Sequence, residues 1–269
     1  MIKKVGDGLY LLYLAHYKFI KNMGLATRIK EFYEDRTKVF LNRRTITIIR
    51  LDGKSFSKLT KPLNKPFDDG FSDDMDATAV YLCENIQGAK FAYTQSDEIS
   101  VVLTDFDTLE SDAWFDYNVQ KMVSVSASLA TAKFNQLRMF REQGNPNYKL
   151  ACFDARVFQV PNIDEMFNAI LQRQQDCTRN SISMAASALY SHKELNGKTG
   201  NEKQELIFQK GINWNDYKTK YKRGSIIKKH SFEVDGPNGE TAIRSKWIPV
   251  ETPIFTEDKD FLYNLIPKP

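Results

Sequence analysis

Residues 45–53 read Thr-Ile-Thr-Ile-Ile-Arg-Leu-Asp-Gly, and they decide how the rest of the sequence is interpreted. The first seven are mostly β-branched or apolar, which is typical of a buried strand. Asp52-Gly53 is a common turn pair that would end this strand. The segment therefore predicts a buried strand with a carboxylate at its end.

A second acidic turn follows the predicted strand. Residues 89–94 and 99–104 are strand-like and flank Gln95-Ser-Asp-Glu98, which predicts a hairpin with a polar tip. If strand 45–51 lies beside this hairpin, Asp52 and Asp97 meet at one end of the sheet. Two carboxylates repel each other unless a cation lies between them, and Mg²⁺ prefers oxygen ligands. On spacing alone, two ordinary turns without a metal remain an open alternative.

The remaining pattern places helices and strands around this pair. The order strand, helix, hairpin, helix, strand, helix predicts an α+β fold, with an antiparallel sheet backed by helices. A loop is expected at 192–203, and strand-like pieces occur in the last forty residues. Apolar periodicity and breaking residues predict helices over 72–87, 112–141 and 163–191, and a strand over 150–160.

The composition is that of an ordinary globular protein. Of 269 residues, 42% are hydrophobic, and no run reaches the roughly 18 apolar residues of a membrane span. Cys83, Cys152 and Cys177 are widely spaced, so we expect no disulfide framework and a cytoplasmic location. The net charge of +4 permits a nucleic-acid partner without requiring one.

Two basic segments could bind phosphates. The first follows Asp52 and contains Lys54, Lys58, Lys61 and Lys65; the backbone of residues 53–56 could cradle a triphosphate. The second spans residues 214–229, where aromatic residues between the basic ones could stack on RNA bases. A solvated charged surface is the simpler interpretation of each. The residues of the second segment are Trp214, Tyr217, Lys218, Lys220, Tyr221, Lys222, Arg223, Lys228 and Lys229.

Seven short motifs follow one another along the chain. They are Arg50-Leu-Asp-Gly-Lys-Ser-Phe56, Lys65-Pro66, Tyr93-Thr-Gln-Ser-Asp-Glu98, Phe153-Asp-Ala-Arg156, Arg173-Gln-Gln-Asp176, Lys203-Gln-Glu205 and Tyr221-Lys-Arg-Gly224. Each motif is weak alone, but their order is specific. In this order they resemble the tRNA-His guanylyltransferase family over about residues 24–230.

The resemblance implies a polymerase-like palm that uses two Mg²⁺ ions, with ATP, GTP and other nucleoside triphosphates as substrates. It implies that Asp52, the Gly53 carbonyl and Asp97 hold the metals, with Glu98 as a further catalytic acid. The implied nucleotide-binding residues are Gly53, Lys54, Ser55, Phe56, Lys65, Ser96, Lys121 and Arg156.

The resemblance also implies tRNA as the partner and a homotetramer as the assembly. The implied RNA-binding residues are Asp176, Arg179, Asn180, Lys203, Lys222 and Arg223. Three regions are expected: a peripheral extension at 1–22, the palm at 23–161, and a helical, RNA-contacting region at 162–269 that packs with the palm. No membrane partner is expected.

One departure from the sequence of the eukaryotic members favours one activity of the family over the others. Thr178 stands where they have a histidine tied to tRNA-His, and Thr178-Arg-Asn-Ser-Ile182 is similar to the bacterial and archaeal branch. That branch adds nucleotides to truncated tRNA 5′ ends by copying the opposite strand. The alternatives are a dedicated enzyme that adds one G to tRNA-His, a non-catalytic tRNA-binding protein, and a palm enzyme making small nucleotides.

Overall fold

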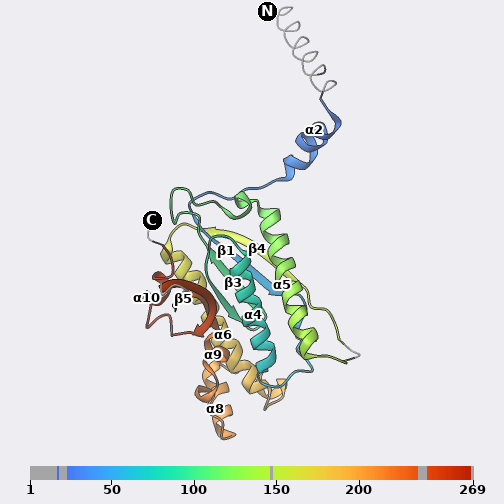
Figure 1. The fold of residues 1–269 in the computed structure, drawn as a ribbon. Helices are drawn as coiled ribbons and strands as arrows, with labels where there is room; N and C mark the ends of the chain where they lie inside the picture. The colour runs from blue at the N-terminus through green and yellow to red at the C-terminus, as the bar shows by residue number, and fades with distance from the viewer. Residues whose placement is uncertain (1–16, 18–22, 146–147, 236–240, 268–269) are drawn as a thin grey trace, which may run out of the picture. The chain divides into compact units, whose positions relative to one another are not determined.

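The computed structural model describes residues 17, 23–145, 148–235 and 241–267 (Figure 1). The chain divides into two compact units, residues 1–40 and 41–269. Apart from Tyr17, the predicted N-terminal extension lies outside the described residues and stays a prediction. The described part of the first unit contains α2 (Leu25–Ile29), η1 (Lys30–Glu34) and η2 (Asp35–Thr37).

The second unit is built on one six-stranded sheet in which every neighbouring pair is antiparallel. The strand order is β4-β1-β3-β2-β5-β6. The strands are β1 (Ile46–Gly53), β2 (Ala89–Gln95), β3 (Glu98–Leu103), β4 (Phe153–Val160), β5 (Ser225–Asp235) and β6 (Thr241–Glu251).

Helices cover both faces of this sheet, which confirms the predicted α+β fold. On one face, Leu82 of α4 and Phe134 of α5 pack with Leu51 of β1. On the other face, Ile170 of α6 packs with Ile48 of β1. Figure 1 shows α4 and α5 lying across the sheet. The helices of this unit are α3 (Phe56–Leu59), α4 (Asp69–Asn85), α5 (Val119–Arg141), α6 (Ile163–Ser187), α7 (His192–Leu195), α8 (Gly200–Gln209), α9 (Thr219–Arg223) and α10 (Asp260–Tyr263), with short turns η3 (Trp114–Tyr117) and η4 (Trp214–Asp216).

The predicted strand 45–51 and the hairpin 89–104 are present as β1, β2 and β3. β1 lies between β3 and β4, and its residues Ile48, Ile49 and Leu51 are completely buried. A strand with neighbours on both sides and helices on both faces needs apolar residues at successive positions, which is the pattern of this segment. The local sequence therefore predicts that this segment is an interior strand of the sheet.

The helix predicted from residue 112 begins later, at Val119, and this part of the prediction is wrong. Phe115, Asp116 and Tyr117 have φ between 51° and 58°, which no α-helix allows. The Asn118 side chain then caps α5 by accepting a hydrogen bond from the Lys121 N–H at 3.0 Å. Tertiary contacts of Tyr117 override the helical pattern here.

The predicted loop 192–203 is also wrong in part, because it contains α7 and the beginning of α8. Both helices start with a capping box, in which a hydroxyl residue and a glutamate three positions later satisfy each other's backbone N–H groups. The pairs are Ser191 with Glu194, and Thr199 with Glu202. Both pairs are visible in the sequence as a hydroxyl residue followed three positions later by a glutamate.

Strands β5 and β6, which lie in the expected region 162–269, belong to the same sheet. β5 pairs with β2 from Ser225 to Lys228, so the C-terminal strands extend the palm. Gly224 allows this pairing, because a Cβ atom there would lie 2.5 Å from the Thr94 carbonyl oxygen. Among the described residues, no helix has the length and apolar character needed to cross a membrane.

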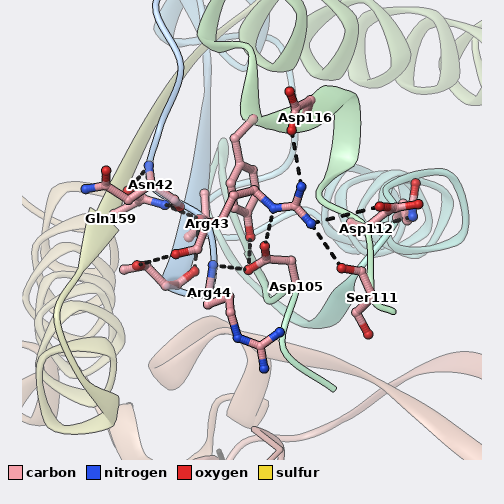
Figure 2. Close-up of polar contacts among 12 residues, drawn as sticks. Asn42, Arg43, Arg44, Asp105, Ser111, Asp112, Asp116 and Gln159 are labelled. Carbon is pink, nitrogen blue, oxygen red and sulfur yellow. Dashed lines mark hydrogen bonds and ion pairs between the residues drawn. The ribbon is translucent and has the colours of Figure 1, made fainter. Parts of the chain in front are cut away.

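A buried carboxylate, Asp105, lies at the end of the sheet where β1 starts (Figure 2). It accepts hydrogen bonds from Arg43 Nε at 2.7 Å, from the Arg44 N–H at 2.7 Å and from the Tyr117 hydroxyl at 3.1 Å. Arg43 also contacts Asp116 at 3.2 Å. This network fixes Tyr117 and with it the start of α5.

Candidate active site

Carboxylates gather at the opposite end of the sheet, where β1 ends. Asp52 is paired in register with Glu98 of β3 and with Asp154 of β4. Asp97 lies in the turn between β2 and β3, and its carbonyl accepts a hydrogen bond from the Gly53 N–H at 3.0 Å. The structure therefore brings together Asp52 and Asp97, whose meeting the sequence predicted, and adds Asp154.

Burial and neighbouring negative charges disfavour the charged forms of Asp52 and Asp97. The pKa of Asp52 is raised, first by burial and then by the charge of Asp154. The pKa of Asp97 is also raised, chiefly by burial and further by the charge of Asp52. A cation bound between them would remove this repulsion, so the electrostatics favour a metal here.

The donor set has the character of a magnesium site rather than a closed structural site. Within the described residues, no group of three or more His, Cys, Asp and Glu side chains is placed to hold a metal ion. Mg²⁺ is commonly held by only one or two carboxylates, with waters and substrate phosphates completing its ligands. Asp52 and Asp97 fit this mode of Mg²⁺ coordination.

Glu98 is held by two arginines on the same side of the sheet. Arg173 Nη1 contacts Glu98 Oε2 at 3.0 Å, and Arg50 Nε lies 3.8 Å from Oε1. Glu98 is 9% exposed, and its Oε1 is buried without a hydrogen-bond partner. The charge of Glu98 is thus largely compensated, unlike that of Asp52 and Asp97.

Arg50, Arg173 and Asp154 were not selected as site residues from the sequence. Each stands inside one of the seven motifs, which was the available signal. Their proximity depends on the register of β1 with β3 and β4 and on the packing of α6, which no local pattern reveals.

The loop after β1 offers less to a triphosphate than predicted. Two of the four expected backbone donors are used internally: Gly53 N–H by Asp97, and Lys54 N–H by the Cys152 carbonyl at 2.8 Å. The Phe56 ring is 2% exposed and packs on Phe134 and Phe153, so it does not line a pocket. These are corrections, because the core and the strand edge take these groups first. Ser55 is exposed, in a left-handed conformation with φ of 59°.

Packing against Phe56 also explains why residue 53 is a glycine. A Cβ atom at Gly53 would lie 2.4 Å from Cγ of the Phe56 ring. Any larger residue would push the ring out of the core or shift the backbone beside Asp52. The glycine therefore couples the core to the acidic site.

A cavity of about 110 Å³, open to solvent, adjoins the Asp97 turn. It collects three residues predicted from the sequence, namely Lys65, Ser96 and Asn180. The aromatic ring of Phe67 stacks on Tyr221 in its wall, with centroids 4.5 Å apart. Hydrophobic walls with a few polar groups are typical of a small-ligand site.

Two other predicted nucleotide contacts fall in different places. Arg156 lies on β4 opposite Arg50, with its exposed side chain 3.7 Å from Asp154, so it is at the acidic end. Lys121 lies in the first turn of α5, next to Tyr117 and the Asp105 network, and its Nζ lies 5.6 Å from the centre of the Phe115 ring. Within one chain Lys121 therefore lies at the end of the sheet opposite Asp52, and its role in nucleotide binding stays a prediction.

The predicted RNA-binding residues are not equally available. Asp176 is hydrogen-bonded to Arg173 and Arg179, and Lys203 Nζ donates to Ser183 Oγ at 3.1 Å. Lys222 is 7% exposed and donates to the Asn215 carbonyl, so it is a structural residue, which is a further correction. The Arg223 carbonyl accepts a hydrogen bond from the Tyr93 hydroxyl at 2.7 Å, while Asn180 lines the cavity.

Two lysines of the basic segment around α9 are paired with acidic residues of α4. Lys218 contacts Asp69 at 2.7 Å, and Lys220 contacts Asp73 at 2.7 Å. The aromatic residues between them are packed rather than presented for stacking, as Tyr221 shows. The sequence could not reveal these acid partners, which lie on a helix about 150 positions earlier.

An antiparallel, helix-backed sheet with acidic residues at the end of a central strand and at the neighbouring hairpin defines a nucleotidyltransferase palm. The family described as tRNAHis guanylyltransferase (Thg1) matches residues 26–161, about half of the chain. The chain belongs to the tRNA-His guanylyltransferase family, and the resemblance drawn from the seven motifs is confirmed. It is therefore a nucleotidyltransferase of a family that acts on tRNA.

Solved structures and curated relatives agree with this assignment. A bacterial tRNA(His) guanylyltransferase (Thg1)-like protein in complex with ATP is 40% identical, with a TM-score of 0.81, over 90% of this chain and 99% of that chain. A bacterial Thg1-like protein in complex with GTP is 38% identical, with a TM-score of 0.76, over 90% and 98%. The tRNA(His) guanylyltransferase of Schizosaccharomyces pombe is 31% identical over 68% of this chain and 72% of that protein.

Proposed function

We propose that this protein adds nucleotides to the 5′ end of tRNA in the 3′–5′ direction, copying the opposite strand, and so repairs truncated 5′ ends. One observation carries the choice within the family. Thr178 replaces the histidine tied to tRNA-His, and its hydroxyl donates to the Lys222 carbonyl at 2.9 Å. The higher identity to bacterial Thg1-like proteins than to the S. pombe enzyme supports the same choice.

The proposed reaction has three balanced steps. ATP first adenylylates the 5′-monophosphate, releasing pyrophosphate. The 3′-hydroxyl of an incoming nucleoside triphosphate then attacks the activated phosphate, and AMP leaves. Pyrophosphate is finally hydrolysed from the added nucleotide. Such chemistry needs positioning and charge neutralisation rather than a nucleophilic side chain.

Asp52, Asp97 and the Gly53 carbonyl would hold Mg²⁺, expected as two ions. The raised pKa of both carboxyl groups and their mutual repulsion support this assignment. When bound, the metal would neutralise phosphate charge in the transition state. The chain's own part is to keep the two carboxylates together through the β1–β3 pairing and the Gly53–Asp97 hydrogen bond.

The surrounding residues would bind the nucleotide. The cavity with Lys65, Ser96 and Asn180 adjoins the Asp97 turn, so a base and ribose held there would direct their phosphates toward the carboxylates. Arg156, exposed beside Asp154, would neutralise phosphate charge. ATP and GTP bound to the bacterial relatives support nucleoside triphosphates as ligands of this chain. A homotetrameric assembly and a cytoplasmic location are part of the proposal.

A 5′-extension assay tests the proposal. It uses a tRNA that lacks its first nucleotide, with Mg²⁺, ATP and each nucleoside triphosphate in turn, and variants of the opposing base. We expect the nucleotide that restores pairing to be added in every case, and Asp97→Ala to lower the rate by at least about 10³-fold, as losing a dominant electrostatic group does.

Two other outcomes would replace the proposal. Addition of G alone, and only to tRNA-His, would identify a dedicated guanylyltransferase. RNA binding without any extension, by wild type and Asp97→Ala alike, would identify a non-catalytic binding protein.

A further inference from the structure

Two glutamines are buried among the described residues, and the surroundings of their carboxamide groups differ. Gln174 on α6 is 4% exposed; its Nε2 donates to the Pro253 carbonyl at 2.7 Å, and its Oε1 accepts from the Phe255 N–H at 3.0 Å. Gln95, the last residue of β2, is 7% exposed, and its Oε1 is buried without a hydrogen-bond partner. Within the described residues, its Nε2 has no hydrogen-bond partner either.

The free carboxamide of Gln95 lowers the stability of the folded chain. A buried donor or acceptor without a partner costs free energy, because folding removes it from water and gives nothing in return. Nearly all buried polar groups in native proteins are therefore paired. A methionine at this position would have a similar length and no such cost. A ligand that contacts Gln95 would satisfy both of its groups and explain why a glutamine stands here.

The location of Gln95 indicates which kind of ligand this is. It lines the cavity that adjoins the Asp97 turn, and it is paired in register with Glu98, so a ligand there lies beside the acidic site. The stacked rings of Phe67 and Tyr221 line the same cavity. Aromatic rings together with a hydrogen-bonding side chain are the groups by which proteins hold an unpaired nucleobase.

We propose that Gln95 binds the adenine of the ATP that activates the 5′ end of the tRNA. A carboxamide offers a donor and an acceptor side by side, and one edge of adenine presents the complementary pair, the N6 amino group and N7. The same edge of guanine carries two acceptors, O6 and N7, which suit an arginine instead. The inference rests on the proposed function for ATP as the activating nucleotide, and it adds the residue that recognises its base.

Two variants provide a matched test of stability. Gln95→Met and Gln174→Met each replace a buried carboxamide with an apolar side chain of similar length. We expect Gln95→Met to unfold at an equal or higher urea concentration than wild type, because it removes an unsatisfied group. Gln174→Met should unfold at a lower concentration, since the Pro253 carbonyl and the Phe255 N–H lose their partner. A lower midpoint in Gln95→Met would overturn the proposal, because the carboxamide would then be structural.

Binding is tested with ATP and with purine riboside triphosphate, which lacks the 6-amino group. Equilibrium dialysis in the presence of Mg²⁺ measures the affinity of each protein for each nucleotide. Wild type and Gln174→Met should bind ATP about fivefold or more tightly than the analogue, because the analogue leaves Gln95 Oε1 unpaired. Gln95→Met should bind the two nucleotides equally. A preference for ATP that persists in Gln95→Met would also overturn the proposal.

The 5′ end of the tRNA separates activation from nucleotide addition. A 5′-monophosphate needs ATP, whereas a 5′-triphosphate already carries pyrophosphate as its leaving group. Gln95→Met should raise the KM for ATP with the first RNA, and the ratio of its rate on the first RNA to that on the second should fall by about fivefold or more. An equal loss on both RNAs would contradict the assignment to the activating ATP. If wild type extends neither RNA but Gln95→Met abolishes the binding preference, the proposed function fails and the base contact stands.

Discussion

Both ends of the sheet carry carboxylates shielded from solvent, but the environments of these carboxylates differ: Asp105 is buried, whereas Asp52 and Asp97 are half-buried. At the start of β1, Asp105 is 1% exposed and accepts hydrogen bonds from Arg43, Arg44 and Tyr117. At its other end, burial raises the pKa of Asp52 and Asp97, and the charge of Asp154 on Asp52 and of Asp52 on Asp97 raises each further.

This difference separates structural acids from functional ones. A buried carboxylate with a full set of donors is stable in its charged form, so Asp105 can organise the chain around it. A pair whose charged form is disfavoured lowers stability unless something else binds there. Raised pKa values in a cluster next to a cavity are thus a physical signature of a ligand site.

Removing Asp105 should have the largest effect on stability. Asp105→Ala leaves the Arg44 N–H and the Tyr117 hydroxyl without their acceptor, and each buried unsatisfied group costs about 1–3 kcal/mol. We expect urea unfolding to show a loss of roughly 2–6 kcal/mol. The left-handed residues 115–117 should also lose protection from hydrogen exchange.

Asp97→Ala is the matched control for this loss. It removes a carboxylate of raised pKa, so its unfolding midpoint without metal should equal or exceed that of wild type at neutral pH. A large loss of stability in Asp97→Ala would show that the two ends of the sheet do not differ as argued.

Asp76 is another buried carboxylate, and it tests whether a raised pKa lowers stability at high pH. It lines the cavity, accepts a hydrogen bond from Ser225 Oγ at 3.2 Å, and burial raises its pKa to about 6. Because the folded pKa exceeds the unfolded value, the stability tied to its protonated form is present below about pH 4 and lost as pH rises through about 6. Asp76→Asn should therefore be more stable than wild type at pH 8, by at most about 3 kcal/mol.

Comparing the stability of wild type and Asp76→Asn across pH isolates the titration of Asp76. Chemical denaturation at pH 4 should give nearly equal free energies of unfolding for wild type and Asp76→Asn. The gap should open between about pH 4 and 6 and then stay constant. A gap that is independent of pH would mean that Asp76 does not titrate in this range.

The sequence predicted those parts of the fold and site that depend on local pattern. The apolar run of β1, the polar hairpin tip and the meeting of Asp52 with Asp97 follow from strand periodicity and turn residues. The three left-handed residues at 115–117 could not be predicted, since they are imposed by Asp105, which is twelve positions from Tyr117 and contacts it only after folding.

At the surface, the sequence does not reveal which charged residues form ion pairs. Lys220 and Lys246 look alike in the sequence, as basic residues with aromatic neighbours. Only the fold shows that Lys220 is paired with Asp73 on α4, whereas Lys246 lies over the ring of Phe232. Equivalent residue types in the sequence therefore do not indicate whether a lysine is paired in the fold.

Magnesium should stabilise the protein through the acidic end of the sheet alone. Its effect on stability should be smaller than the effects of Asp105→Ala and Asp76→Asn. Binding to the folded state at ten times its Kd adds about 1.4 kcal/mol, which raises the Tm of a domain of this size by about 3–6 °C. The raised pKa values of Asp52 and Asp97 mean that protons compete with Mg²⁺, so the shift should shrink as pH falls. Calorimetry with Mg²⁺ or EDTA measures it: Asp76→Asn should keep the shift and Asp97→Ala should lose it. An equal shift in Asp97→Ala would place the ion elsewhere, and the repulsion between the two carboxylates would then need another explanation.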